Sequence, residues 1–250
     1  MADVDGDGWL DLLTGSDDCC DHEPGFYWFR REENGRFTAQ PKVHVQVADG
    51  EVVLFMSRFR VALADWDSDS RPDLIVSATN LYSSTKDDRP SSLYISEGAW
   101  SVAGGEVAAP RPVEGAPEHL LQQPCVVDWD GDGRPDLITR TSTYQGGGRP
   151  FLSSVRWQRN IAGEGERGPR LAEPQVLLEL PEGEGISGLS AADWNGDGQP
   201  DLIVGYYRGG RTAADRASGN PRITGVRVYP RVSSPDGNKG SNSASETGRF

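Results

Sequence analysis

The apolar residues of this chain fall into short runs separated by Gly, Pro, Asp and Ser. Several runs alternate apolar and polar residues with a period of two, which is typical of β-strands with one buried face. No segment shows the 3.6-residue apolar stripe of an amphipathic helix. The pattern therefore predicts an all-β fold of many short strands, among them 26–29, 93–95, 155–157 and 226–229. Weaker fourth strands of the repeats are expected at 43–47, 106–108 and 175–178.

A ten-residue acidic segment occurs four times and organises these strands into repeats. The segments begin at Asp3, Asp65, Asp128 and Asp193, which are 62, 63 and 65 positions apart, and each segment ends in Asp-Leu. Each repeat supplies about four strands, and the acidic segment joins the first strand to the second. A four-stranded unit repeated in this way indicates a β-propeller blade. A linear β-solenoid fits less well because its coils are usually much shorter.

The repeat spacing also predicts the domain boundaries. The blades are expected at about 1–57, 58–120, 121–185 and 186–232, followed by a Gly/Ser/Asn-rich tail, 233–250, that is expected to be disordered. The first blade lacks a strand before its acidic segment, and the last lacks a strand after Tyr229. We therefore expect part of a larger ring, whose open strand edges would favour self-association.

The acidic segments are predicted to be cation sites. Oxygen ligands at alternate positions, with glycine where the chain turns, suit a hard cation that takes 6–8 oxygens. Positions 1, 3, 5 and 9 would supply side-chain oxygens, and position 7 a backbone carbonyl. The predicted ligands are Asp3, Asp5, Asp7, Trp9 and Asp11; Asp65, Asp67, Asp69, Arg71 and Asp73; Asp128, Asp130, Asp132, Arg134 and Asp136; and Asp193, Asn195, Asp197, Gln199 and Asp201.

Two other interpretations of the acidic segments are weaker. An EF-hand needs a Glu at position 12, where this chain has Thr14, Val76, Thr139 and Val204. Asp and Gly also favour turns without any ion, but four loops that each carry three or four carboxylates would repel themselves without a counter-ion. Calcium, at up to four ions, is therefore preferred over magnesium, which demands stricter octahedral geometry.

The four loops are not expected to bind equally. The second loop has Ser68 and Ser70 where the others have Gly, and a non-glycine residue at positive φ costs on the order of 1 kcal/mol. The fourth loop has Asn195 in place of an aspartate. The first and third loops should be the tighter sites.

The net charge of −13 supports cation sites rather than a disordered acidic tail, because fifteen of the 38 acidic residues lie in the four segments. The chain has no basic stripe, so nucleic-acid binding is not expected. It has no apolar run long enough to span a membrane. No secretory signal is visible at the N-terminus, and the three cysteines do not identify a redox compartment.

The repeated pattern Asp-x-Asp/Asn-Gly-Asp-Gly-x-x-Asp-Leu resembles the FG-GAP/VCBS repeat family, over about residues 1–232. Blades of this type occur in the head of integrin α-subunits and in many bacterial secreted proteins. The resemblance implies a propeller of about seven blades, with calcium in the loops between first and second strands, in a secreted or cell-envelope protein. The Phe-Gly and Gly-Ala-Pro signatures that name the family are not evident, so no ligand-binding residues carry over.

A possible ligand surface is suggested by tyrosine and arginine residues that recur between the second and third strands of the repeats. Tyr and Arg dominate binding hot spots; alternatively, these tyrosines cover strand ends and the arginines balance acids. The tryptophans at motif position 2 are expected to pack between blades. The candidate ligand-binding residues are Tyr82, Arg89, Tyr144, Arg149, Tyr206, Tyr207 and Arg208.

No catalytic constellation is visible, because the three histidines are scattered and no nucleophile motif, phosphate loop or zinc spacing occurs. The leading hypothesis is a non-catalytic, calcium-binding recognition or adhesion module for an extracellular protein or glycan. The alternatives are the propeller domain of a calcium-dependent polysaccharide lyase or hydrolase, and a structural spacer.

Overall fold

A computed structural model of the chain describes residues 3–15, 25–45, 57–66, 72–79, 92–96, 106–107, 111–116, 124–144, 151–163, 166, 168–209, 222–231 and 245–246. Regular structure in these ranges consists of β-strands, and no helix occurs in them. The prediction of an all-β chain is confirmed. The described part accordingly holds no helix of the length and apolarity needed to cross a membrane.

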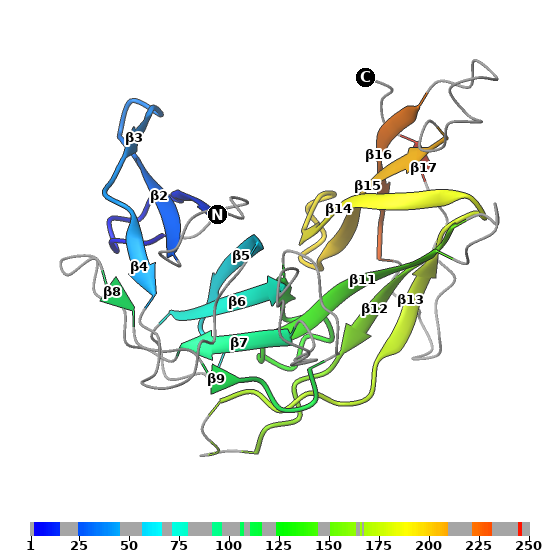
Figure 1. The fold of residues 1–250 in the computed structure, drawn as a ribbon, viewed down its shortest axis with the longest axis horizontal. Helices are drawn as coiled ribbons and strands as arrows, with labels where there is room; N and C mark the ends of the chain where they lie inside the picture. Colours follow the sequence, from blue (N-terminus) through cyan, green and yellow to red (C-terminus); the bar gives the residue numbers. More distant parts are fainter. Residues whose placement is uncertain are drawn as a thin grey trace. The chain divides into compact units, whose positions relative to one another are not determined.

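The strands form four sheets (Figure 1). The first sheet has the order β1-β2-β4-β8, and β3 also pairs with β2. Its strands are β1 (Leu12–Gly15), β2 (Gly25–Arg31), β3 (Phe37–Ala39), β4 (Val43–Val45) and β8 (Glu106–Val107). β8 runs parallel to β4, whereas the other pairs of this sheet are antiparallel.

The other three sheets have four strands each, in chain order. The second contains β5 (Ser57–Ala64), β6 (Asp73–Thr79), β7 (Ser92–Ser96) and β9 (Arg111–Pro112). The third contains β10 (Cys125–Val127), β11 (Asp136–Tyr144), β12 (Phe151–Gln158) and β13 (Gln175–Glu179). The fourth contains β14 (Glu184–Ala192), β15 (Asp201–Arg208), β16 (Ile223–Tyr229) and β17 (Ser245–Glu246).

Two strand predictions were wrong. The fourth strand of the second repeat was expected at Glu106–Val107, but these residues pair with β4 of the first sheet, and β9 takes the expected place beside β7. No strand was expected after Tyr229, yet β17 pairs with β16 through Arg227↔Glu246 and Val228↔Ser245. Both strands are two residues long, so they carry almost no periodic signal. The other residues of the tail lie outside the described ranges.

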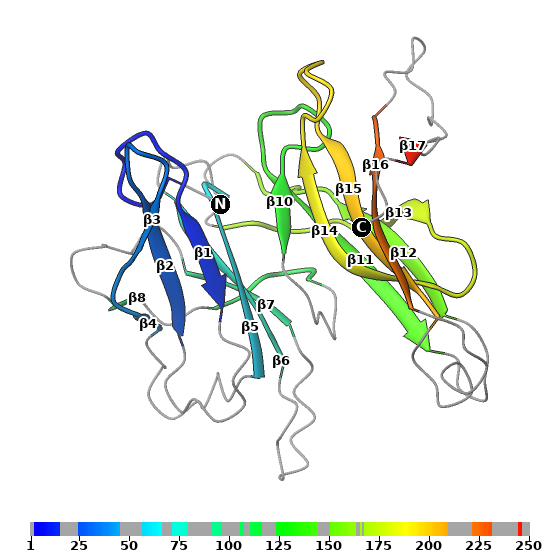
Figure 2. The same ribbon diagram turned by 90° about the horizontal axis from the view of Figure 1, so that it is seen from above.

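The chain divides into two compact units. The first contains Met1–Val126, Arg134–Leu137 and Arg159–Glu173, and the second contains Val127–Gly133, Ile138–Gln158 and Pro174–Phe250. In the first unit, apolar side chains that alternate along the strands form cores between the sheets. In the second unit, the buried side chains include Ile186, Leu202 and Val204, and Figure 2 shows β14, β15 and β16 side by side.

The tryptophans at motif position 2 have different environments. Trp66 is 1% exposed and its indole Nε1 donates to the carbonyl of Pro135 at 2.8 Å. Trp129 is buried, and the Arg231 guanidinium stacks on it with a distance of 5.1 Å to the ring centre. Trp194 is 61% exposed. Packing therefore explains the first two but not the third.

Candidate metal centre in the acidic loops

Each acidic segment leads directly into a strand: the first strand of its sheet in the first repeat, and the second strand of its sheet in the other three, as the sequence predicts. The segments precede β1, β6, β11 and β15. The first, third and fourth loops are described in full. In the second loop Asp67, Asp69 and Arg71 lie outside the described residues, so their predicted ligand roles stay predictions.

The first aspartate of a loop organises its backbone. In the first loop, Asp3 Oδ1 accepts hydrogen bonds from the N–H groups of Gly6 and Asp7 at 2.8 and 3.1 Å, and Oδ2 accepts one from Gly8 at 2.9 Å. Asp128 and Asp193 receive the same three bonds in their own loops. The three loops therefore share one folded conformation.

The glycines of the loops adopt backbone angles that other residues disfavour. Gly6 and Gly8 have φ of 75° and 88°, and the corresponding glycines of the third and fourth loops have φ between 79° and 86°. The sequence interpretation that glycine is required at these places is confirmed for the three described loops. Ser68 and Ser70 of the second loop lie outside the described residues.

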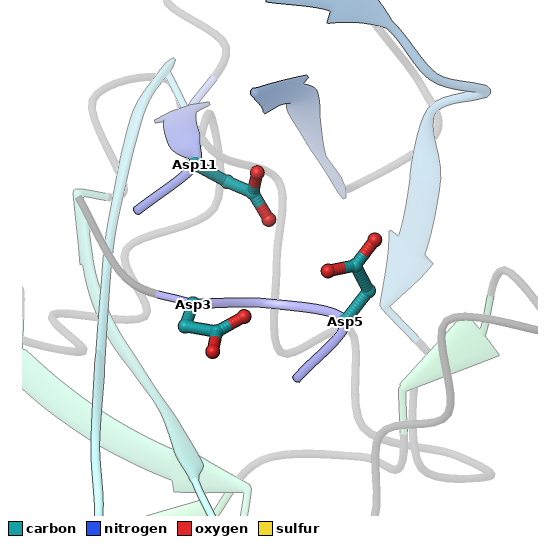
Figure 3. A group of neighbouring side chains, drawn as sticks. All are labelled: Asp3, Asp5 and Asp11. Carbon is teal, nitrogen blue, oxygen red and sulfur yellow. The ribbon is translucent and has the colours of Figure 1, made fainter. Parts of the chain in front are cut away.

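Carboxylates converge in the first and third loops. Asp3, Asp5 and Asp11 each offer an oxygen, and these oxygens lie within 4.8 Å of one another. Figure 3 shows the three carboxylates grouped around one space. In the third loop Asp128, Asp130 and Asp136 form the same grouping. An all-oxygen, negatively charged donor set is what a hard divalent cation such as calcium prefers, so these residues fit the predicted ion.

The fifth-position carboxylates take part in other contacts. Asp7 Oδ1 accepts the N–H of Trp9 at 2.9 Å, and Asp197 Oδ1 accepts that of Gln199 at 2.9 Å. In the fourth loop, the Asn195 side-chain amide donates to Asp197 Oδ2 at 3.0 Å. This loop thus joins its third and fifth positions by an internal hydrogen bond.

The ninth aspartate of each motif has a structural role that the sequence analysis did not identify. Asp11 is fully buried; its Oδ2 accepts the N–H of Val4 at 3.2 Å, and its Oδ1 accepts that of Arg31 at 2.7 Å. Asp201, also fully buried, does the same with Trp194 at 3.0 Å and Arg231 at 2.8 Å. The carboxylate therefore ties the start of the loop to the end of the strand that follows its own, β2 in the first sheet and β16 in the fourth.

This pair of backbone hydrogen bonds to the ninth aspartate is here called the brace, and parts of it occur in the other two sheets. Asp73 Oδ2 accepts the N–H of Trp66 at 2.7 Å, and Asp136 Oδ1 accepts that of Asn160 at 2.8 Å. Both aspartates are fully buried. The signal that could have revealed this role is the aspartate placed directly before a leucine in all four repeats.

An arginine lies beside the carboxylates of the first loop. Arg30 Nε donates to Asp5 Oδ2 at 2.6 Å, and Arg30 Nη2 donates to Asp7 Oδ2 at 2.9 Å. The pKa of Asp7 is lowered, first by the hydrogen bond from Trp9 N–H and then by Arg30. The pKa of Arg30 is raised by its hydrogen bonds to Asp7 and Asp5. Two of the predicted metal ligands are thus already paired with a cation of the protein.

Comparison with known protein families identifies the family to which the chain belongs. The profile described as "FG-GAP-like repeat" matches residues 3–76 and 128–204, more than half of the chain. The chain belongs to the FG-GAP-like repeat family. The resemblance inferred from the acidic segments is confirmed, and each match begins at the first aspartate of a loop. FG-GAP-like repeats are β-propeller blades and are typical of extracellular proteins. Among curated proteins, no sequence matches this chain.

The predicted tyrosine and arginine surface of these FG-GAP-like repeats is described only in part. Tyr206 and Tyr207 are 6% and 8% exposed. The Arg227 guanidinium lies 3.8 Å from the ring centre of Tyr206, and that of Arg222 lies 4.8 Å from Tyr207. The two rings are therefore packed under arginines rather than presented to solvent.

The remaining members of that surface give little further information. Arg208 is exposed at the end of β15. Tyr144 is the last residue of β11, and its side chain is not described. Tyr82, Arg89 and Arg149 lie outside the described residues, so their ligand-binding roles stay predictions.

Proposed function

We propose that this chain is a calcium-binding β-propeller module that recognises a protein or glycan outside the cell and does not catalyse a reaction. The observation that carries the proposal is the convergence of Asp3, Asp5 and Asp11 within 4.8 Å, repeated by the third loop. Carboxylates held this close repel one another, and a divalent cation relieves that repulsion while satisfying its own demand for oxygen ligands.

Each loop would hold its ion through the same positions. In the first loop Asp3, Asp5 and Asp11 would supply carboxylate oxygens, with Asp7 and the Trp9 carbonyl as the further predicted ligands. The hydrogen bonds from Gly6, Asp7 and Gly8 to Asp3 orient its carboxylate before any ion arrives. A loop ordered in advance loses less conformational entropy on binding.

The ion would stabilise the fold rather than take part in chemistry. A ligand that binds only the folded state adds about 2.7 kcal/mol when its concentration is about 100 times its dissociation constant. Because the second, third and fourth loops each join two strands of a sheet, this added stability would act on the sheet itself. Up to four ions are proposed, with the first and third loops as the three-carboxylate sites.

The recognition role is supported by family membership, since FG-GAP-like repeats are typical of extracellular proteins. A β-sheet can present its connecting loops as a binding surface while its strands stay fixed. A secreted or cell-envelope location is part of the same proposal.

Calcium titration by calorimetry, combined with thermal melting with and without chelator, tests the proposal. Saturable binding, with a rise in melting temperature that chelator abolishes, is the expected result. Asp5→Asn and Asp130→Asn should each lower the stoichiometry by one, whereas Glu33→Gln, which removes an exposed acid outside the loops, should not. Absence of saturable binding in the folded wild-type chain would overturn the calcium assignment.

The proposal that the chain does not catalyse a reaction needs a separate measurement. Polysaccharides retained by the calcium-loaded chain would be incubated with it and examined for new reducing ends and unsaturated products. Binding without turnover is expected. Calcium-dependent cleavage would refute the proposal and identify a lyase or hydrolase.

A further inference from the structure

Arg231, which follows β16 in the fourth sheet, joins two acidic loops. Its backbone N–H donates to Asp201 Oδ1, on the ninth aspartate of the fourth loop, at 2.8 Å. Its guanidinium Nη1 donates to the backbone carbonyl of Trp129 in the third loop, and the guanidinium lies over the Trp129 ring, 5.1 Å from the ring centre. The three residues belong to the second compact unit. One residue therefore contacts both a predicted ligand of the fourth loop and the backbone of the third.

The third sheet repeats this arrangement with a different side chain. Asn160 lies two residues after β12, as Arg231 lies two residues after β16. Its backbone N–H donates to Asp136 Oδ1 at 2.8 Å, and its side-chain amide donates to the carbonyl of Trp66 at 3.3 Å. Trp66 holds the position in the second loop that a tryptophan also holds in the third. Because an asparagine and an arginine at equivalent positions make the same link, the link is a property of the repeat.

Trp129 stands between two predicted ligands of the third loop. Asp128 and Asp130, its neighbours in the chain, belong to the carboxylate group that could hold one cation. An ion bound by both would restrict the backbone between them, and with it the Trp129 carbonyl. A restricted carbonyl holds the guanidinium of Arg231, whose N–H in turn holds the Asp201 carboxylate. Asp201 would then lose less conformational freedom when the fourth loop binds its own ion.

We propose that Arg231 couples the third and fourth loops, so that calcium bound in the third loop raises the calcium affinity of the fourth. The inference rests on the proposed calcium binding and adds that the ions do not bind independently. The coupling is reciprocal, because an effect of one ion on the affinity of the other holds in both directions. Direct repulsion between two divalent ions has the opposite sign and is weakened by salt. A positive coupling therefore does not arise from the charges of the ions alone.

Calcium titration followed by NMR measures the two loops separately, with the amide signals of Gly133 and Gly198 as reporters of the third and fourth loops. Asp130→Asn removes a carboxylate of the third loop, while its side-chain oxygen can still accept the Asp132 N–H. This variant should raise the dissociation constant of the fourth loop about fivefold or more, which is the lower end of typical coupling between sites. Asp5→Asn is the matched control, because it makes the same change in a loop of the other compact unit, and it should leave that constant unchanged.

A double-mutant cycle assigns the coupling to Arg231. Arg231→Met removes the donor to the Trp129 carbonyl but keeps the backbone N–H that binds Asp201. With Arg231→Met present, Asp130→Asn should change the fourth-loop dissociation constant by less than about twofold, the usual limit for sites that do not interact. Arg231→Ala should give the same result, which removes dependence on one substitution. Arg208→Met is the matched control, because Arg208 is an exposed arginine of the same sheet, and it should preserve the effect of Asp130→Asn.

The outcomes separate this inference from the calcium assignment. Calcium binding at both loops, with a fourth-loop affinity that is the same in Asp130→Asn as in the wild type, would overturn the coupling alone. An effect of Asp130→Asn that survives both Arg231 variants would overturn the role of Arg231. Absence of calcium binding at both loops would overturn the calcium assignment together with the coupling. Circular dichroism must first show that the variants are folded, and the comparison of Asp130→Asn with the wild type needs no Arg231 variant.

Discussion

The buried brace formed by the ninth aspartate can be tested most directly at Asp201. Its side chain is fully buried, and its two oxygens accept backbone hydrogen bonds from different segments. Oδ2 accepts the N–H groups of Trp194 at 3.0 Å and Asn195 at 3.3 Å, and Oδ1 accepts that of Arg231 at 2.8 Å. Replacement by Asn or Ala should therefore loosen the fourth loop and the end of β16 together.

The expected magnitude follows from the bonds that are lost. A hydrogen bond to a charged group contributes about 1.5–3 kcal/mol, and a buried N–H left without a partner costs about 1–3 kcal/mol. Asp201→Asn keeps the shape but turns one oxygen into an NH₂ group that faces an N–H donor, so a loss of about 3 kcal/mol is expected. Asp201→Ala removes both acceptors and should cost about 3–6 kcal/mol. Either loss is a large fraction of a typical unfolding free energy of about 5–15 kcal/mol.

Guanidinium denaturation and amide hydrogen exchange measure these effects, both in excess chelator. Chelator separates the brace from any role of Asp201 as a calcium ligand. Exchange should accelerate at the amides of Trp194 and Arg231 before it accelerates elsewhere. Asp197→Asn is the matched control because Asp197 is an exposed aspartate of the same loop, and its effect should stay below about 1 kcal/mol.

The reasoning fails if Asp201→Asn and Asp197→Asn have the same denaturation midpoint in chelator. It also fails if the Trp194 and Arg231 amides exchange in Asp201→Asn as slowly as in the wild type. A loss seen only when calcium is present would instead make Asp201 a ligand without a structural role.

Three further predictions concern the loops and the fourth sheet. Gly196→Ala should cost about 1–2 kcal/mol in thermal melting because Gly196 has a φ of 79°, although its added Cβ would meet no atom within 4 Å. Arg30→Gln should raise the calcium affinity of the first loop in a calorimetric titration, because the arginine no longer competes for two carboxylates; unchanged affinities at the other loops serve as reference. Glu184→Gln should lower the free energy of unfolding by roughly 3–5 kcal/mol in a denaturation experiment. The reason is that Arg227, whose side chain is only 12% exposed, would lose the carboxylate with which it forms an ion pair.

The sequence predicts the sheets well because its repeats are long and regular. Four copies of one acidic segment fix where each second strand begins, and period-two patterns locate the strands around them. The short strands β9 and β17, and the pairing of β8 with β4, escape prediction because two residues cannot show a period. Their pairing depends on which sheet edge lies within reach, a tertiary property.

The sequence likewise predicts some features of the candidate site and misses others. Positions 1, 3 and 9 of the first and third loops converge as the spacing indicates. The brace was missed because an aspartate in an acidic motif looks like another ligand until its burial and its backbone donors are known. Tyr206 and Tyr207 were misplaced on a surface because the arginines that cover them, Arg227 and Arg222, come from the next strand of the sheet and the residue before it.

The brace and the proposed ion act on the same turn from opposite sides. Asp3 gathers three N–H groups of the loop, while Asp11 ties the loop to β2 from the buried side. The backbone conformation is thus supported by neutral donors before the charge of Asp3 is compensated, whereas Asp5 is already paired with Arg30. Calcium would then act mainly by relieving repulsion among carboxylates that the fold already holds together. On this proposal, an unbound loop would be strained electrostatically rather than unfolded, which would distinguish it from metal sites whose ligands assemble only when the ion binds.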